Sequence, residues 1–323
     1  MKHILYITFI FSLFVCYVQA DETPVFIEIK GGYVAAFSPD GTKIVADRIW
    51  DAETGKELQK LEGQDRSFYS VAFSPDNKKI VTGGVDKTAR IWDAETGKEL
   101  LKLEGHTGRV NSAVFSSDGK RVLTGSAGQT VRIYDAESGK EWQMFEAYPG
   151  PNGRFSVTFS PNGKKVLAAH LCYAPKVFDA ETGKELQTLE GHVGGVTGGV
   201  FSAVFSADGH KMVTAGLDGT IRLWDTETGK ELQKWKGLVT VHSAAFSPDG
   251  KKIVTGDDDG TARIWDVETE KVLHELKGHT PRSDFSVAFS PDGKKVITSG
   301  SDMIVRIWDW ERCPPPRPAI TDF

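Results

Sequence analysis

Hydrophobic and polar positions alternate along this chain in short runs, and clusters of turn residues separate the runs. Residues 69–73, YSVAF, alternate small and large side chains, which is typical of a strand with two differently packed faces. Residues 74–77, SPDN, predict a tight turn, because Pro presets φ and Asp and Asn tolerate turn geometry. Further strands are predicted at 79–82, 88–92 and 98–103. Four short strands joined by three short turns therefore make one unit.

The unit recurs seven times along the chain. Its third strand ends in Trp-Asp or a close variant, and successive aspartates lie 42, 42, 44, 46, 41 and 43 residues apart. A repeat of four strands with this period is typical of a β-propeller, because one small sheet cannot bury both of its faces without neighbours. The seven aspartates are Asp51, Asp93, Asp135, Asp179, Asp225, Asp266 and Asp309.

The order of motifs within the unit resembles the WD-repeat β-propeller family. Gly-His opens units three, five and seven, at His106, His192 and His279, and the third strand closes with Trp-Asp. Two units depart at the aromatic position, where Tyr134 and Phe178 replace Trp. The resemblance covers residues 25 to 312 and implies an all-β fold, a seven-bladed propeller of four-stranded antiparallel blades.

In that family, a buried network joins the Gly-His histidine, a hydroxyl on the second strand, an Asp in the following turn and the third-strand Trp. We interpret such sets as structural rather than as hydrolase triads, because they recur at blade spacing and satisfy a buried indole donor. Blades six and two have Leu238 and Gln64 where the histidine would stand. By position the network falls on His192, Thr214, Asp218 and Trp224 in blade five, and on His279, Thr298, Asp302 and Trp308 in blade seven.

The two ends of the propeller sequence predict how the ring closes. The last unit runs into residues 314–316, PPP, which lack the backbone donors that an outer strand needs. Residues 25–31 align instead with residues 57–63, the outer strand of unit one. We therefore expect the N-terminal strand to complete blade seven, the propeller to span residues 21–312, and residues 313–323 to form a Pro-rich tail.

The first 20 residues predict a secretory signal peptide. Lys2 precedes an apolar run at 4–18 that is too short to span a bilayer comfortably, and small residues precede a cleavage site after Ala20. The protein is then exported to the periplasm or the extracellular space and keeps no membrane span after cleavage. An uncleaved membrane anchor and a lipoprotein at Cys16 are the alternatives.

Charge and motifs limit the classes of function. The net charge is −5, and loss of Lys2 with the leader makes it about −6, so no basic excess is present to bind nucleic acid. We find no Cys/His metal-ligand spacing, phosphate-binding Gly loop or nucleophile elbow, and we expect no catalytic, metal or cofactor residues and a monomer. The run Asp257-Asp-Asp259 leaves a calcium site as an alternative.

One end of the ring varies from blade to blade. From the Gly-His position to the strand Phe, the loop has nine residues in blade three, thirteen in blade five and five in blade one. Blade one also loses six residues between its second and third strands, so a notch is expected there. Variable loops on a rigid scaffold favour binding of partners.

We therefore predict a non-enzymatic scaffold that binds a protein or peptide through this variable end. The alternatives are a propeller enzyme or small-molecule binder that uses the central channel, and a structural surface protein. The residues expected to line the variable end are Arg66, Phe68, Arg109, Tyr148, Arg154, His170, Leu217, His242, Asp258, Arg282 and Ser301.

Overall fold

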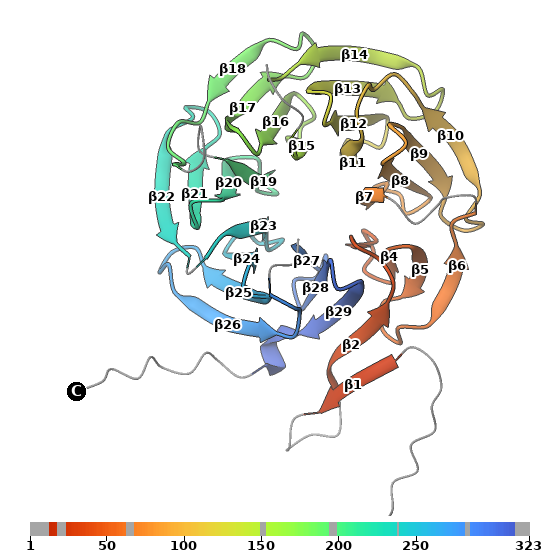
Figure 1. Ribbon diagram of the computed structural model, residues 1–323, viewed down its shortest axis with the longest axis vertical. Coiled ribbons are helices and arrows are strands. Elements are labelled where there is room, and N and C mark those ends of the chain that lie inside the picture. The colour runs from red at the N-terminus through yellow and green to blue at the C-terminus, as the bar shows by residue number, and fades with distance from the viewer. Residues whose placement is uncertain are drawn as a thin grey trace, which may run out of the picture.

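A computed structural model describes residues 13–17, 24–62, 68–148, 153–193, 199–237, 239–281 and 285–313 of the chain. Seven sheets surround a central axis like the blades of a propeller, and the chain visits them in order around the ring (Figure 1). Six sheets have four antiparallel strands and one has five. The predicted all-β, seven-bladed propeller is therefore confirmed.

Each blade runs from an inner strand at the channel to an outer strand at the rim (Figure 1). The inner strands are β3 (Ala36–Phe37), β7 (Phe68–Phe73), β11 (Val110–Phe115), β15 (Phe155–Phe159), β19 (Val200–Phe205), β23 (Val241–Phe246) and β27 (Phe285–Phe289). The second strands are β4 (Lys43–Val45), β8 (Lys79–Gly84), β12 (Arg121–Ser126), β16 (Lys165–His170), β20 (Lys211–Gly216), β24 (Lys252–Asp257) and β28 (Lys295–Gly300).

The outer half of each blade is built in the same way. The third strands are β5 (Arg48–Asp51), β9 (Ala89–Asp93), β13 (Thr130–Asp135), β17 (Tyr173–Asp179), β21 (Thr220–Asp225), β25 (Thr261–Asp266) and β29 (Ile304–Asp309). The outer strands are β6 (Glu57–Lys60), β10 (Glu99–Leu103), β14 (Glu141–Glu146), β18 (Glu185–Thr188), β22 (Glu231–Lys236), β26 (Val272–Lys277) and, in blade seven, β2 (Pro24–Lys30).

The hydrophobic core lies between blades rather than within them. Seven clusters of buried apolar side chains occur, and each combines residues from two neighbouring blades. Between blades two and three, for example, Val81 and Ile91 pack with Val122 and Tyr134. Each blade thus depends on both neighbours to bury its two faces, which is why the repeat folds only as a ring.

The N-terminal strand closes the ring, as predicted. Strand β2 pairs antiparallel with β29, and Phe26 lies opposite Trp308. The Glu28 carboxylate accepts from the Arg306 guanidinium at 2.7 Å, and Ile29 is buried in the cluster between blades seven and one. After Asp309 the chain forms a short 3-10 helix, η1 (Trp310–Arg312), instead of an outer strand. The first and last strands of the propeller are therefore hydrogen-bonded to each other.

An additional strand, β1 (Leu13–Tyr17), pairs antiparallel with the outer side of β2, with Leu13 opposite Ile29. No strand is predicted there from the sequence, and the segment belongs to the predicted leader, whose remaining residues lie outside the described part of the chain. In the described residues, no helix has the length and apolar character needed to cross a membrane.

Blade one is shortened at the variable end. Strand β3 has two residues and β4 has three, whereas β11 and β12 of blade three have six each. The register survives, with Ile44 opposite Trp50, because removing an even number of residues keeps each side chain on its face. The shortened strands therefore still contribute to the core on both sides.

Candidate functional site: the mouth of the central channel

Four inner strands begin with a register irregularity at the variable end of the ring. In β7, Phe68 lies opposite Gly84 and Ser70 opposite Gly83, so the intervening Tyr69 has no residue opposite it in the ladder. A bulge of this kind re-aims one side chain relative to the regular alternation. The same irregularity occurs at Asn111, Phe201 and His242.

Three of these bulge residues line one pocket of about 480 Å³. Because its walls come from blades one to five, the pocket lies where consecutive inner strands converge, at the mouth of the central channel. We call it the mouth pocket. Its lining residues are Tyr33, Tyr69, Arg109, Asn111, Gly153, Arg154, Leu171 and Phe201.

Aromatic rings and arginine side chains contact one another around the mouth pocket. The guanidinium carbon of Arg109 lies 5.4 Å from the ring centroid of Tyr69, and Tyr69 meets Tyr33 edge-on at 5.9 Å between centroids. The Arg154 guanidinium carbon lies 5.6 Å from the centroid of Phe201. These contacts link side chains of different blades and orient two cations over aromatic faces.

The series continues into blade six. The Phe201 and His242 rings have centroids 4.8 Å apart, and His242 Nε2 lies 3.1 Å from Asp258 Oδ1. Since one histidine and one carboxylate meet here, the arrangement offers an orienting hydrogen bond rather than a metal site. Within the ranges that the structure describes, no group of three His, Cys, Asp or Glu side chains could hold a metal ion.

The structure describes nine of the eleven residues predicted to line the variable end. Arg109 and Arg154 line the mouth pocket, and His242 and Asp258 extend it into blade six. Leu217 and Ser301 are exposed outside the pocket lining. Arg66 and Arg282 lie outside the described residues.

The prediction that Phe68, Tyr148 and His170 face a partner is wrong, because all three side chains are buried. Phe68 packs between blades one and two. Tyr148 stands at the Gly-His position of blade four, and its hydroxyl donates to the carbonyls of Ala168 and Ala174 at 2.8 and 3.1 Å. His170 packs against the rings of Tyr148 and its neighbours.

Four lining residues were not predicted from the sequence: Tyr33, Tyr69, Asn111 and Phe201. In blade two Phe68 was predicted instead of the adjacent Tyr69, because strict alternation does not anticipate a bulge that re-aims the next residue. The signal that could have found the site is the recurrence of a large or polar residue one position before the inner-strand serine, at Tyr69, Asn111, Phe201 and His242.

The network residues of blade five are brought together as the family resemblance implies. His192 Nδ1 lies 3.0 Å from Asp218 Oδ1, and its Nε2 lies 2.7 Å from the Thr214 hydroxyl. The Trp224 indole donates to the same hydroxyl at 2.8 Å. Although burial opposes ionisation, hydrogen bonds from His192 and the Val193 amide hold the pKa of Asp218 below its usual range.

Blade seven has the same geometry, with His279 Nδ1 2.9 Å from Asp302 Oδ2 and Nε2 2.8 Å from the Thr298 hydroxyl. The Trp308 indole donates to that hydroxyl at 2.8 Å. Burial lowers the pKa of His279, against the opposing effect of Asp302. Because the Thr298 hydroxyl is buried and already bonded to the Trp308 indole and to His279, it is not accessible to a substrate.

In blade six an arginine, rather than a histidine, pairs with the aspartate of the turn. Trp265 still donates to the Thr255 hydroxyl at 3.0 Å, but Asp259 pairs with the Arg263 guanidinium, as does the fully buried Asp257. Burial raises the pKa of Asp257 to about 6, and Arg263 opposes that rise. The carboxylates considered for calcium are therefore held by Arg263 and, at Asp258, by a histidine. Leu238 lies outside the described residues.

Asp257 occupies the register position at which blade five has Gly216. A Cβ atom added to Gly216 would lie 2.6 Å from the Gly199 carbonyl oxygen and 3.2 Å from His192 Nδ1, so this position faces the Gly-His histidine and has no room for a side chain. Blade five can have only glycine at this position. Blade six has Leu238 in place of the histidine in its sequence, and there the Asp257 side chain occupies the equivalent position.

Comparison with known proteins supports the repeat. Five segments, residues 55–93, 97–135, 183–225, 229–266 and 270–309, match the family described as "WD domain, G-beta repeat" and together make up more than half of the chain. The repeat at residues 139–179 is not among them, and it has Phe178 and Ala168 where blade five has Trp224 and Thr214.

Two of the curated relatives match short segments of this chain. The chain is 38% identical over 64 residues to the periodic tryptophan protein 2 homolog of Neurospora crassa, a match that covers 20% of this chain and 7% of that protein. It is 35% identical over 61 residues to the intraflagellar transport protein 122 homolog of Mus musculus, covering 17% and 5%. The matched segments span less than a tenth of these much longer relatives.

Proposed function

This chain belongs to the WD-repeat family of β-propellers, and we propose that it is a non-enzymatic scaffold that binds a protein or peptide at its mouth pocket. Propellers of this family typically bind proteins. The observation that carries the proposal is the convergence of Tyr69, Arg109, Arg154 and Phe201 from four blades on one pocket. Aromatic and Arg side chains on a rigid support are the residue types that dominate the energy of interfaces.

The chemistry of the pocket favours a segment with an acidic side chain next to an apolar one. Arg109 is exposed and has no carboxylate partner among the described residues, so its guanidinium can donate two parallel hydrogen bonds to a partner's carboxylate. The Tyr69 and Phe201 rings provide apolar surface beside the two arginines. Since both cations lie over rings, little side-chain entropy remains to be lost on binding.

We further propose that the scaffold works as a monomer outside the cytoplasm, in the periplasm or the extracellular space, after cleavage of the leader behind Ala20. The leader's short apolar run and small residues before the cleavage site support this location. A pocket of about 480 Å³ is also within the size range of small-ligand sites, which supports a small-molecule binder as a second candidate.

A capture experiment tests the scaffold proposal. Residues 21–323 are immobilised, and proteins retained from the extracellular or envelope fraction are compared with those retained by Arg109→Ala and Tyr69→Ala. We expect both variants to lose at least nine-tenths of a specific partner. Leu100→Ala, which changes an exposed residue of the outer strand β10, is the matched control and should retain it.

Equal retention by all three variants would show that the partner binds elsewhere on the ring. Retention of no protein, together with a metabolite that co-purifies with the wild type and is lost in Arg109→Ala, would favour the small-molecule binder instead. Size-exclusion chromatography of the same samples separates a monomeric scaffold from a self-assembling surface protein.

A further inference from the structure

At the end of the ring opposite the mouth pocket a lysine recurs from blade to blade, and at two junctions its ammonium group donates to the turn of the next blade. The first residue of the second strand is lysine in six blades and arginine only in blade three, at Arg121. In blade two, Lys79 Nζ donates to the Ala136 carbonyl at 3.2 Å and to the Glu137 carboxylate at 2.8 Å, both in the next blade.

The junction between blades four and five repeats this contact. Lys165 Nζ donates to the Thr226 carbonyl at 3.2 Å and to the Glu227 carboxylate at 3.1 Å. In both cases the acceptors lie in the turn after the third strand. The carbonyl belongs to the first residue after the aspartate that ends this strand, and the carboxylate belongs to the second. The repeat thus shows twice that this turn binds a primary ammonium with one carbonyl and one carboxylate.

Blade three has no lysine at this position, and its Arg121 contacts a side chain of its own blade. Its guanidinium carbon lies 3.7 Å from the ring centroid of Trp142, at a position where five other outer strands have leucine. This cation-π contact keeps the charge of Arg121 on the Trp142 ring. The equivalent acceptors in blade four are the Ala180 carbonyl and the Glu181 carboxylate, and in the described part of the chain Glu181 forms no ion pair.

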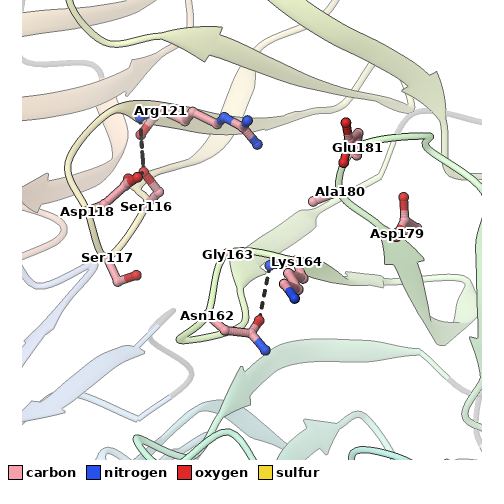
Figure 2. Close-up of a pocket in the computed structure, with 10 residues that line it drawn as sticks. All are labelled: Ser116, Ser117, Asp118, Arg121, Asn162, Gly163, Lys164, Asp179, Ala180 and Glu181. Carbon is pink, nitrogen blue, oxygen red and sulfur yellow. Dashed lines mark hydrogen bonds between the residues drawn. The ribbon is translucent and has the colours of Figure 1, made fainter.

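A pocket of about 490 Å³ lies at this junction. Figure 2 shows the turn of Asp179, Ala180 and Glu181 on one side and the turn that leads into Arg121 on another, with Lys164 between them. The equivalent pocket between blades two and three measures about 460 Å³ and has Lys79 in its wall. The two junctions therefore differ mainly in whether a lysine of the chain is present at the acceptors.

We propose that the pocket between blades three and four binds a lysine side chain of a partner protein, whose ammonium donates to the Ala180 carbonyl and the Glu181 carboxylate. Lysine fits better than arginine, because its compact charge on a long stem matches what Lys79 and Lys165 provide at the sister junctions. Three carboxylates line the pocket, at Asp118, Asp179 and Glu181, against the cations Arg121 and Lys164. This site is independent of the function proposed for the mouth pocket.

The probe for this site is N-α-acetyl-lysine methylamide, titrated into the isotopically labelled protein of residues 21–323. We expect saturable shifts of the backbone amide signals of Glu181 and Lys164. Glu181→Gln removes the carboxylate and should weaken binding at least tenfold. Arg121→Lys supplies the internal ammonium that the sister junctions have, and should block the probe while leaving the fold unchanged.

Glu137→Gln is the matched control, because it alters the acceptor that Lys79 already occupies, and it should bind the probe like the wild type. The same probe acetylated at Nζ should cause no shift. The proposal is overturned if no saturable shift occurs, or if Glu181→Gln and Arg121→Lys bind the probe as well as the wild type does. Sedimentation velocity of wild type and Arg121→Lys then shows whether the lysine comes from a second copy of the chain or from another protein.

Discussion

The indole nitrogen of Trp308 donates a hydrogen bond to the hydroxyl of Thr298 at 2.8 Å, and both side chains are buried. In blade one Ala46 stands at the position of Thr298, and the indole nitrogen of Trp50 has no hydrogen-bond partner among the described residues. The blades therefore differ in whether the indole of the third strand is hydrogen-bonded. Blade one, in which it is not, also has the shortest inner and second strands.

Thr298→Val tests how much the bracing contributes to stability. The substitution keeps the side-chain shape but leaves the buried donor of Trp308 and a ring nitrogen of His279 without their partner. We expect a loss of about 1–3 kcal/mol in the free energy of unfolding, measured by denaturant titration with an unchanged slope. Thr188→Val on the outer strand β18 is the control, with an expected change below about 0.5 kcal/mol. Equal losses would show that the hydroxyl of Thr298 has no special role.

The pairing of β2 with β29 predicts that the N-terminal strand matters for stability despite its terminal position. Deleting residues 21–30 from the mature protein removes Ile29 from the core and the Glu28 partner of Arg306, and exposes the edge of β29. We expect a sharp fall in melting temperature and concentration-dependent association. Deleting residues 314–323 should change neither. If the N-terminal deletion melts like the intact mature protein, closure contributes little to stability.

Asp257 predicts a specific dependence of stability on pH. Its pKa in the folded state, about 6, lies above the ordinary value of 3.8, mainly because of burial and despite the hydrogen bond from Arg263. A raised carboxyl pKa contributes stability that is present below the unfolded-state pKa and is lost as the pH rises through the folded-state value. The stability advantage of wild type over Asp257→Asn should therefore fall by about 2 kcal/mol between pH 4 and pH 6.5 and change little above pH 7.

Asp259 serves as the control for this measurement, because it pairs with the same arginine but its pKa is lowered. Although desolvation raises that pKa, hydrogen bonding and charge from Arg263 outweigh it. Its contribution should be present above the unfolded-state pKa and disappear as the pH falls. Urea titrations between pH 3.5 and 7 should therefore show that the stability lost in Asp257→Asn shrinks as the pH rises, whereas the stability lost in Asp259→Asn grows. If both losses change with pH in the same way, the assignment is contradicted.

Cleavage of the leader is open to a direct measurement. If cleavage follows Ala20, the mature chain begins at Asp21 and strand β1 is removed with the leader, while β2 keeps its pairing with β29. We expect intact-mass and N-terminal analysis of the extracellular or envelope fraction to find Asp21 as the first residue. A chain that begins at Met1 would contradict export with cleavage and would keep β1 as the outermost strand of blade seven.

The sequence alone determined the architecture of this protein. The strand predicted at 79–82 forms β8, the Trp-Asp positions end the third strands, and residues 25–30 lie in the closing strand β2. These features could be predicted because they depend on local alternation, turn chemistry and a fixed period, which the chain repeats seven times. The alignment of residues 25–31 with an outer strand was enough to predict closure.

Tertiary structure decided which side chains are accessible at each end of the ring. A bulge that depends on pairing between strands turns Tyr69 toward the channel and leaves the neighbouring Phe68 buried. Tyr148 is buried because the surrounding strands offer carbonyl acceptors to its hydroxyl, and Arg121 lies over the ring of Trp142 on another strand. Such contacts join residues far apart in the sequence, so no local pattern encodes them, whereas the period of the repeat is written in every unit.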